Sequence, residues 1–136
     1  MSRMRAVAAG IAGTLVWAAI EPLDKRLFRH DYSDVAVLGK AVTRGRAWPA
    51  VGLAMHAANG AAFGLAYAEL RKRRGVGAMQ LALTEHIVLF PLGYVVDRLH
   101  PARGGPGLAS LFSWRALGQA TVRHAVFGAV LGHLSD

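Results

Sequence analysis

The sequence predicts an all-α integral membrane protein, built as a bundle of four transmembrane helices. Three observations lead to this fold class. Apolar residues make up 54% of the 136 residues, which is high for a soluble domain. They gather into four long runs, and most Lys and Arg residues lie between the runs. Ala and Gly dominate inside the runs, and such small residues allow transmembrane helices to pack closely. We expect a single membrane domain over residues 1–136.

The first run covers residues 6–23 and follows two arginines. Its uncharged part ends at Ile20, which makes it shorter than the roughly 20 residues of a typical span. A basic start before a short apolar run also resembles a signal peptide. We favour a retained helix, because charged residues follow at once in Glu21–Asp24 and three later runs need a first partner. Pro22 is expected to end this helix.

The segment 33–43 is predicted to be a short amphipathic helix on the membrane surface. Aliphatic residues recur in it at helical spacing, and Ser33 or Asp34 can cap its first turn. The alternative is an ordered extramembrane turn that packs on the bundle.

Three further runs, over residues 48–70, 76–96 and 114–134, are long enough to cross a bilayer. Trp48 and Trp114 stand at the starts of two of them, where interfacial anchors belong. A short turn joins the second run to the third, so we expect these two helices to be antiparallel neighbours. A Pro- and Gly-rich loop precedes the fourth run.

The turn between the second and third runs is strongly basic. We expect its side chains to bind anionic lipid headgroups. These residues are Arg71, Lys72, Arg73 and Arg74. The net charge of +8 could also indicate nucleic acid, but no nucleic-acid module is recognisable and only 8% of residues are aromatic. The chain has no cysteine, which excludes disulfides, thiolate nucleophiles and iron–sulfur clusters.

The chain has the pattern of an internal duplication into two tandem helical hairpins. The pattern Trp-x-Ala-x-Gly-x-Ala occupies residues 48–54 and again residues 114–120. A His-Ala pair and then a Phe-Gly pair follow each copy, although the histidine spacing differs by two residues. Parallel repeats of this kind occur in membrane transporters. Chance similarity between helices rich in Ala and Gly is the alternative.

Polar and ionisable residues lie near the middle of the second, third and fourth runs. At the centre of a bilayer a charged side chain costs about 2.5–3.5 kcal/mol, so such groups are expected to face one another or a wet cavity. We therefore predict one buried polar cluster. Its members are His56, Asn59, Glu85, His86, Gln119, Arg123 and His124.

Within this cluster we predict that Glu85 pairs with Arg123, because the midpoints of helices of similar length share a depth. A bidentate carboxylate–guanidinium pair would offset part of the desolvation of the arginine. Gln119 lies one turn from Arg123 and could join the pair. The pair could be a strut that sets helix register. It could also line a polar path in which the histidines relay protons.

Three functions stay open at this stage. The first is a small oligomeric transporter or permeation unit, in which the polar cluster lines the path. The second is a non-catalytic accessory or scaffold subunit of a membrane complex. The third is a haem- or metal-binding bundle, although no familiar ligand spacing occurs and we expect no cofactor. Its weak candidate ligands are His56, Glu85, His86 and His124.

An enzyme is the less favoured interpretation. Glu21, Asp24 and Asp97 are expected as solvated acidic groups near the interface, where acid–base chemistry on lipid would be conceivable. No Gly-x-Ser-x-Gly elbow supports a nucleophilic serine. The expected partners are the lipid bilayer and either further copies of the chain or a larger membrane complex. Size and composition are typical of a multi-pass protein of a bacterial plasma membrane, with its orientation undetermined.

Overall fold

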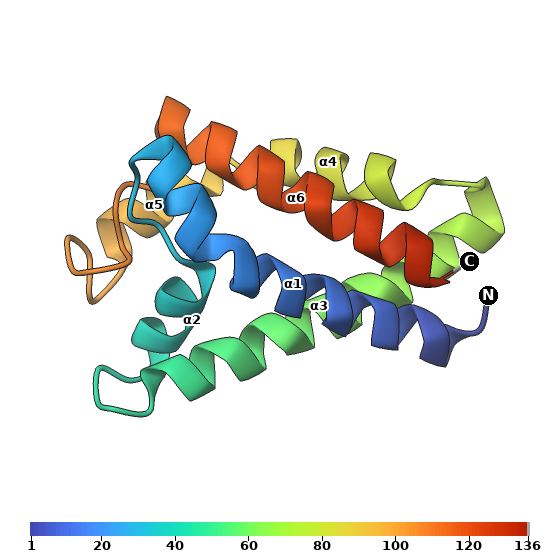
Figure 1. Cartoon of the computed structure of the whole chain (residues 1–136), viewed down its shortest axis with the longest axis horizontal. Helices are drawn as coiled ribbons and strands as arrows, with labels where there is room; N and C mark the ends of the chain where they lie inside the picture. Colours follow the sequence, from blue (N-terminus) through green and yellow to red (C-terminus); the bar gives the residue numbers. More distant parts are fainter. Residues whose placement is uncertain (136) are drawn as a thin grey trace.

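The structure is a computed structural model that describes residues 1–135. These residues form six helices and no strand, so the prediction of an all-helical chain is confirmed. The helices are α1 (Arg3–Phe28), α2 (Asp34–Val42), α3 (Trp48–Arg74), α4 (Ala78–Leu89), α5 (Leu92–Leu99) and α6 (Trp114–Ser135). Figure 1 shows both termini and the α3–α4 turn at one end of the molecule, with α2, α5 and the loop before α6 at the other.

Helix α1 continues past Pro22 to Phe28, so the expected end at this proline is wrong. A proline removes one N–H bond and crowds the carbonyl four residues before it, but tertiary contacts can outweigh that cost. Here the turn after Pro22 carries Asp24, which is buried against α6. The helix instead ends at Arg29, whose left-handed φ of 48° closes the last turn.

The predicted helix between the first two runs is present as α2. Ser33 caps it, because its side-chain oxygen accepts a hydrogen bond from the backbone N–H of Ala36. Helix α2 packs against α3 with the backbones of Gly39 and Gly52 in close approach. A Cβ atom on Gly39 would lie 2.0 Å from the carbonyl oxygen of Trp48. This contact agrees with the alternative given for this segment from the sequence, in which it packs on the helix bundle.

The third run is not one straight helix. It divides into α4 and α5, which meet at Phe90–Pro91 and are bent by 53°. The physical reason is Pro91, which has no N–H to donate to the carbonyl four residues before it and whose ring crowds that carbonyl. The continuous helix expected over residues 76–96 is therefore corrected to a broken one.

Helix α1 is at the centre of the arrangement. It packs extensively on both α3 and α6, and α4 packs on the other side of α6. Figure 1 shows the resulting order α3, α1, α6, α4. Helices α3 and α4 share a short turn, but they pack on each other much less than α1 packs on α3 or α4 packs on α6. The expectation that they are packed neighbours is corrected, because glycine contacts draw α3 and α4 onto different partners.

Small residues bring α1 and α3 together. Gly10 lies against the backbone of Gly60, and Ala6 lies against Gly64. A Cβ atom on Gly10 would be 2.0 Å from the carbonyl oxygen of Gly60, so no larger side chain fits without separating the helices. Spacing by four residues places Gly60 and Gly64 on one face of α3, as in other close helix crossings.

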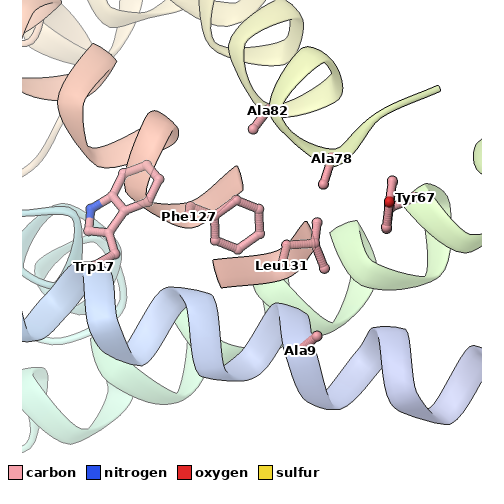
Figure 2. Packing of buried hydrophobic residues seen from close by; sticks show 7 residues of the cluster. All are labelled: Ala9, Trp17, Tyr67, Ala78, Ala82, Phe127 and Leu131. Atoms are coloured by element: carbon pink, nitrogen blue, oxygen red, sulfur yellow. The ribbon is translucent and has the colours of Figure 1, made fainter. Parts of the chain in front are cut away.

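The apolar core is small. Figure 2 shows its seven side chains, which come from α1, α3, α4 and α6. They are Ala9, Trp17, Tyr67, Ala78, Ala82, Phe127 and Leu131. Many larger aliphatic side chains point outward instead, including Leu23, Ile87 and Val88. The interior thus holds small and polar residues, and the exterior carries much of the apolar bulk.

By length and composition, α1 is apolar enough to cross a membrane, and the bent pair α4–α5 would be a second span if it crosses as one unit. Within residues 1–135, α3 and α6 are long enough to cross a membrane, but their sequences are less apolar than this comparison requires. The chain is thus a helical protein with one or two candidate membrane spans.

We predict that Gly10→Ala lowers the free energy of unfolding by about 1–3 kcal/mol, because the added Cβ forces α1 away from α3. Thermal unfolding followed by circular dichroism in mild detergent measures the change. The matched control is Gly132→Ala on α6, where the new Cβ would meet Ala78 at an ordinary 3.5 Å. This control should be neutral or stabilising, since alanine favours helix. Equal effects of the two variants would contradict the close crossing.

Candidate functional site

The most deeply buried charge belongs to Arg123 on α6, whose side chain has 0% exposure. Its guanidinium makes a two-pronged contact with Asp24 on α1. Nε donates to Oδ2 at 2.5 Å, and Nη2 donates to Oδ1 at 2.7 Å. Bidentate pairs of this kind are the strongest form of carboxylate–guanidinium contact. The pair joins two helices that are far apart in the sequence.

The same guanidinium also holds the segment after α1. Nη1 donates to Oδ2 of Asp34 at 2.9 Å, and Nη2 donates to the carbonyl oxygen of Tyr32 at 2.8 Å. Glu21 contributes a third carboxylate at 3.7 Å from Nη1. Gln119, one turn before Arg123, donates to Asp24 at 2.6 Å. We call Arg123 with Glu21, Asp24, Tyr32, Asp34 and Gln119 the arginine network.

The predicted pair of Glu85 with Arg123 is wrong. The nearest ion-pair partner of Arg123 is Asp24, and Glu85 contacts His124 instead. The reason is rotation about α6, because successive helical residues point about 100° apart. Arg123 faces α1, and the next residue faces α4. Matching depth is therefore not enough to pair two side chains.

Two of the three acidic residues expected as solvated interfacial groups are buried. Glu21 has 8% exposure and Asp24 has 3%, because both face Arg123. Asp97, the third, lies at the far end of α5 and organises the loop before α6. Its carboxylate accepts hydrogen bonds from the hydroxyl of Ser110 and the backbone N–H groups of Leu111 and Phe112.

The loop before α6 docks on the segment between α1 and α2. The backbone N–H of Gly107 donates to the carboxylate of Asp31, and Lys25 lies 3.0 Å from the other oxygen of that carboxylate. These two contacts hold the pKa of Asp31 below its usual value. His100 lies 2.8 Å from the carbonyl oxygen of Val37, which adds a second point of attachment. The docked loop covers one end of the helices.

A pocket of about 650 Å³ lies between α3 and α4. Helices α1 and α6 form its floor, and α2 contributes to its end. Asn59 from α3 and Leu89 from α4 line it and are exposed, which marks the gap between these helices as its open side. Its polar lining residues are Tyr32, Asp34, His56, Asn59, Glu85, His86 and His124. The structure thus brings five members of the predicted polar cluster to one pocket, and it places Gln119 and Arg123 in the arginine network.

Glu85 and His124 form a hydrogen-bonded pair on one wall of the pocket. His124 Nδ1 lies 2.7 Å from the carbonyl oxygen of Ala120, which can only accept, so this nitrogen carries a proton. His124 Nε2 lies 3.1 Å from a carboxylate oxygen of Glu85. This contact places the Glu85 carboxylate and the His124 ring within hydrogen-bond distance across α4 and α6.

The protonation of His86 follows from its neighbours. Thr121 donates its hydroxyl proton to the carbonyl oxygen of Leu117 at 2.7 Å. His86 Nε2 lies 2.9 Å from the same hydroxyl oxygen and must therefore donate to it. The rings of His86 and His124 are stacked with centroids 4.5 Å apart. Two positive rings would repel at this spacing, so the arrangement favours a neutral His86.

His56 on α3 is buried to 6% exposure, and its Nε2 finds no hydrogen-bond partner among residues 1–135. Such buried unsatisfied nitrogens are rare, because each costs the desolvation of a polar group. The edge of Trp17 packs against this ring with centroids 5.2 Å apart and against His124 at 4.5 Å. An aromatic residue of α1 therefore separates two histidines that line the same pocket.

The weak metal candidates do not converge on one point. In residues 1–135 no three His, Asp or Glu side chains are arranged to hold a metal ion. His86 and His124 stack face to face, which directs their ring nitrogens along different lines. The residues present therefore do not fit a metal site of the kind considered from the sequence.

The basic turn Arg71–Arg74 is exposed at the end of α3. It meets the N-terminus there, since Glu69 pairs with both Arg73 and Arg3. Arg71 donates to the hydroxyl of Tyr67 at 2.7 Å. The four residues lie on one end of the molecule, far from the loop before α6 (Figure 1). Binding of headgroups there stays a prediction.

Comparison with known proteins adds no further information, because the chain matches no protein family, no curated protein and no solved structure.

Sequence reasoning missed three contributors to these sites. Tyr32 and Asp34 join the arginine network, and Trp17 donates its indole N–H to Asp34 at 2.9 Å. One signal could have found part of this arrangement. Glu21 and Asp24 are three residues apart, so they lie on one helical face, and such a pair of carboxylates needs a buried cation opposite.

We predict that Arg123→Leu lowers the free energy of unfolding by about 3–5 kcal/mol, because it leaves buried carboxylates without a counter-charge. Thermal unfolding in mild detergent measures the loss. Arg115→Leu is the matched control, since Arg115 is exposed on the same helix and should change stability by less than about 0.5 kcal/mol. Comparable melting temperatures for the two variants would contradict a structural role of the arginine network.

Proposed function

We propose that the chain is a multi-pass membrane protein whose pocket binds a small, partly apolar molecule that enters from the bilayer. The proposal includes four spanning segments, namely α1, α3, the bent pair α4–α5, and α6. One observation supports it most directly. A pocket with several titratable side chains has its open side between two helices whose outer surfaces are apolar.

The distribution of polarity supports the membrane part of this proposal. Arg123 and Asp24 are buried, whereas Leu15, Ile87 and Val88 point outward. A protein in water buries its large aliphatic residues and exposes its charges. In a bilayer the helix exterior faces hydrocarbon, and ionisable side chains turn to the interior of the bundle. Arg123, Asp24 and these three aliphatic residues follow the second distribution, which supports a membrane location for the helices.

Inward-facing polar groups also explain the modest hydropathy of α3 and α6. His56 of α3 is buried, as are Gln119 and Arg123 of α6. These side chains lower the mean hydropathy of their helices without contact with lipid. The stretch from Trp48 to Ala68 contains no Asp, Glu, Lys or Arg at all. Composition alone therefore underestimates the apolar character of the faces that would meet lipid.

The two ends of the molecule carry the remaining charge. Arg3 and the turn Arg71–Arg74 lie at one end (Figure 1), and the positive residues Lys25, Arg44 and Arg103 belong to the segments at the other. Two basic rims separated by the length of the helices suit the two headgroup layers of a bilayer. Expected partners at both rims are anionic lipids.

A purely structural role is the second candidate, and the arginine network favours it. That network ties α6 to α1 and to the start of α2 through the guanidinium of Arg123. It is well suited to fix helix register in a scaffold subunit, although Oε1 of Gln119 finds no hydrogen-bond partner among residues 1–135. The pocket side chains need a different explanation, because Glu85 is accessible and the buried Nε2 of His56 has no hydrogen-bond partner within the same residues. A binding or transport role accounts for both sets of residues, with an oligomer supplying any path across the bilayer.

We predict that the turn at Arg73 lies on the same side of the membrane as Ser2, with Gly45 and Gly104 on the opposite side. Because the chain contains no cysteine, single variants Ser2→Cys, Arg73→Cys, Gly45→Cys and Gly104→Cys can be labelled in sealed vesicles. A membrane-impermeant maleimide should react with only one of the two pairs before permeabilisation. Val88→Cys, which is exposed on α4, should stay unlabelled in both conditions. Ser2 and Gly45 on the same side would contradict the four-span arrangement.

We predict that a small neutral aromatic molecule quenches the fluorescence of Trp17 saturably from within the bilayer. The protein carries Trp48→Phe and Trp114→Phe so that Trp17 alone reports, and 4-bromobenzyl alcohol is the quencher. Ala62→Phe should remove the saturable component, because Ala62 lines the pocket. Ala58→Phe is the matched control, since Ala58 is exposed on the same helix outside the pocket lining. Linear quenching in all three proteins would contradict a binding pocket.

A further inference from the structure

Acidic side chains line the pocket, which is unusual for a pocket among helices that are proposed to span a membrane. Asp34 and Glu85 line it, and no Lys or Arg is among the described residues of its lining. Asp34 is already neutralised. One of its oxygens accepts from Trp17 and from Arg123 at 2.9 Å each, and the other accepts from the hydroxyl of Tyr32. Asp34 therefore has little capacity left for a ligand.

Glu85 is the carboxylate that a ligand can reach. About a third of its side chain is accessible (35%), and its hydrogen-bond partner within residues 1–135 is His124. Glu85 lines a pocket that also carries several aromatic rings. A carboxylate beside aromatic faces attracts a positive charge by Coulomb interaction and by cation–π contact. Besides Tyr32 and the histidines, the aromatic lining residues are Trp17, Phe63, Phe90 and Phe127.

We propose that the pocket binds a monovalent organic cation, a protonated amine or quaternary ammonium on an apolar body. The inference rests on the proposed binding function and names its ligand class. The cationic group lies at Glu85, and the apolar body packs against the aromatic rings. A ligand of this chemistry can reach the open side of the pocket from the headgroup region of either leaflet.

Two probes of nearly the same shape separate charge from size. Benzyltrimethylammonium carries the positive charge, and neopentylbenzene is its neutral isostere. In detergent-solubilised protein with Trp17 as the single tryptophan, fluorescence titration at pH 8 should give an affinity for the cation at least about tenfold higher than for the isostere. Glu85→Gln should abolish this preference, and Glu85→Asp should retain most of it. Glu69→Gln, at the exposed end of α3, is the matched control and should bind as the wild type does. Circular dichroism shows whether each variant is folded.

The outcomes separate the inference from the proposed function. If neither probe binds, the pocket itself is not a binding site and the proposed function fails. If both probes bind with equal affinity, the pocket stands and the cation preference is overturned.

Discussion

The contact between Arg123 and Asp24 is the interaction on which the rest of the structure depends. It joins α6 to the last turns of α1 and extends through Asp34 to the start of α2. A guanidinium buried to this degree must have its charge balanced and its donors occupied. The chain meets both needs with residues from three segments. The same contact keeps α1 helical beyond Pro22, because Asp24 must remain within reach.

Helix α6 carries two polar systems on two faces, and they suit different tasks. Arg123 meets α1 through several hydrogen bonds and ion pairs, which favours rigidity. His124 contacts Glu85 on the other face, and Glu85 is partly accessible. The proposed scaffold role and the proposed binding role therefore fall on different residues. The rigid network places Trp17 and Asp34 at the edge of the pocket, so the two systems also support one another.

The pocket exists because helices that adjoin in the chain pack on other partners. Glycine contacts bring α3 onto α1, and Gly128 of α6 brings α4 onto α6, where a Cβ would meet Met79 and Ala82. The space between α3 and α4 remains open and forms the pocket. Close packing of small residues at two helix crossings thus leaves a gap at a third, and the pocket reaches Gly93 of α5, beyond the bend at Pro91.

The sequence by itself determined the helices that depend on local signals. Ser33 caps α2 as expected, and α3 and α6 begin at Trp48 and Trp114, because capping and apolar periodicity act within a few residues. Tertiary structure alone decided the rest. Pro91 breaks a helix whereas Pro22 does not, and the difference lies in the packing of the following turn. The sequence likewise could not predict which side chains pair, because the rotation of each helix about its axis is set by contacts between distant segments.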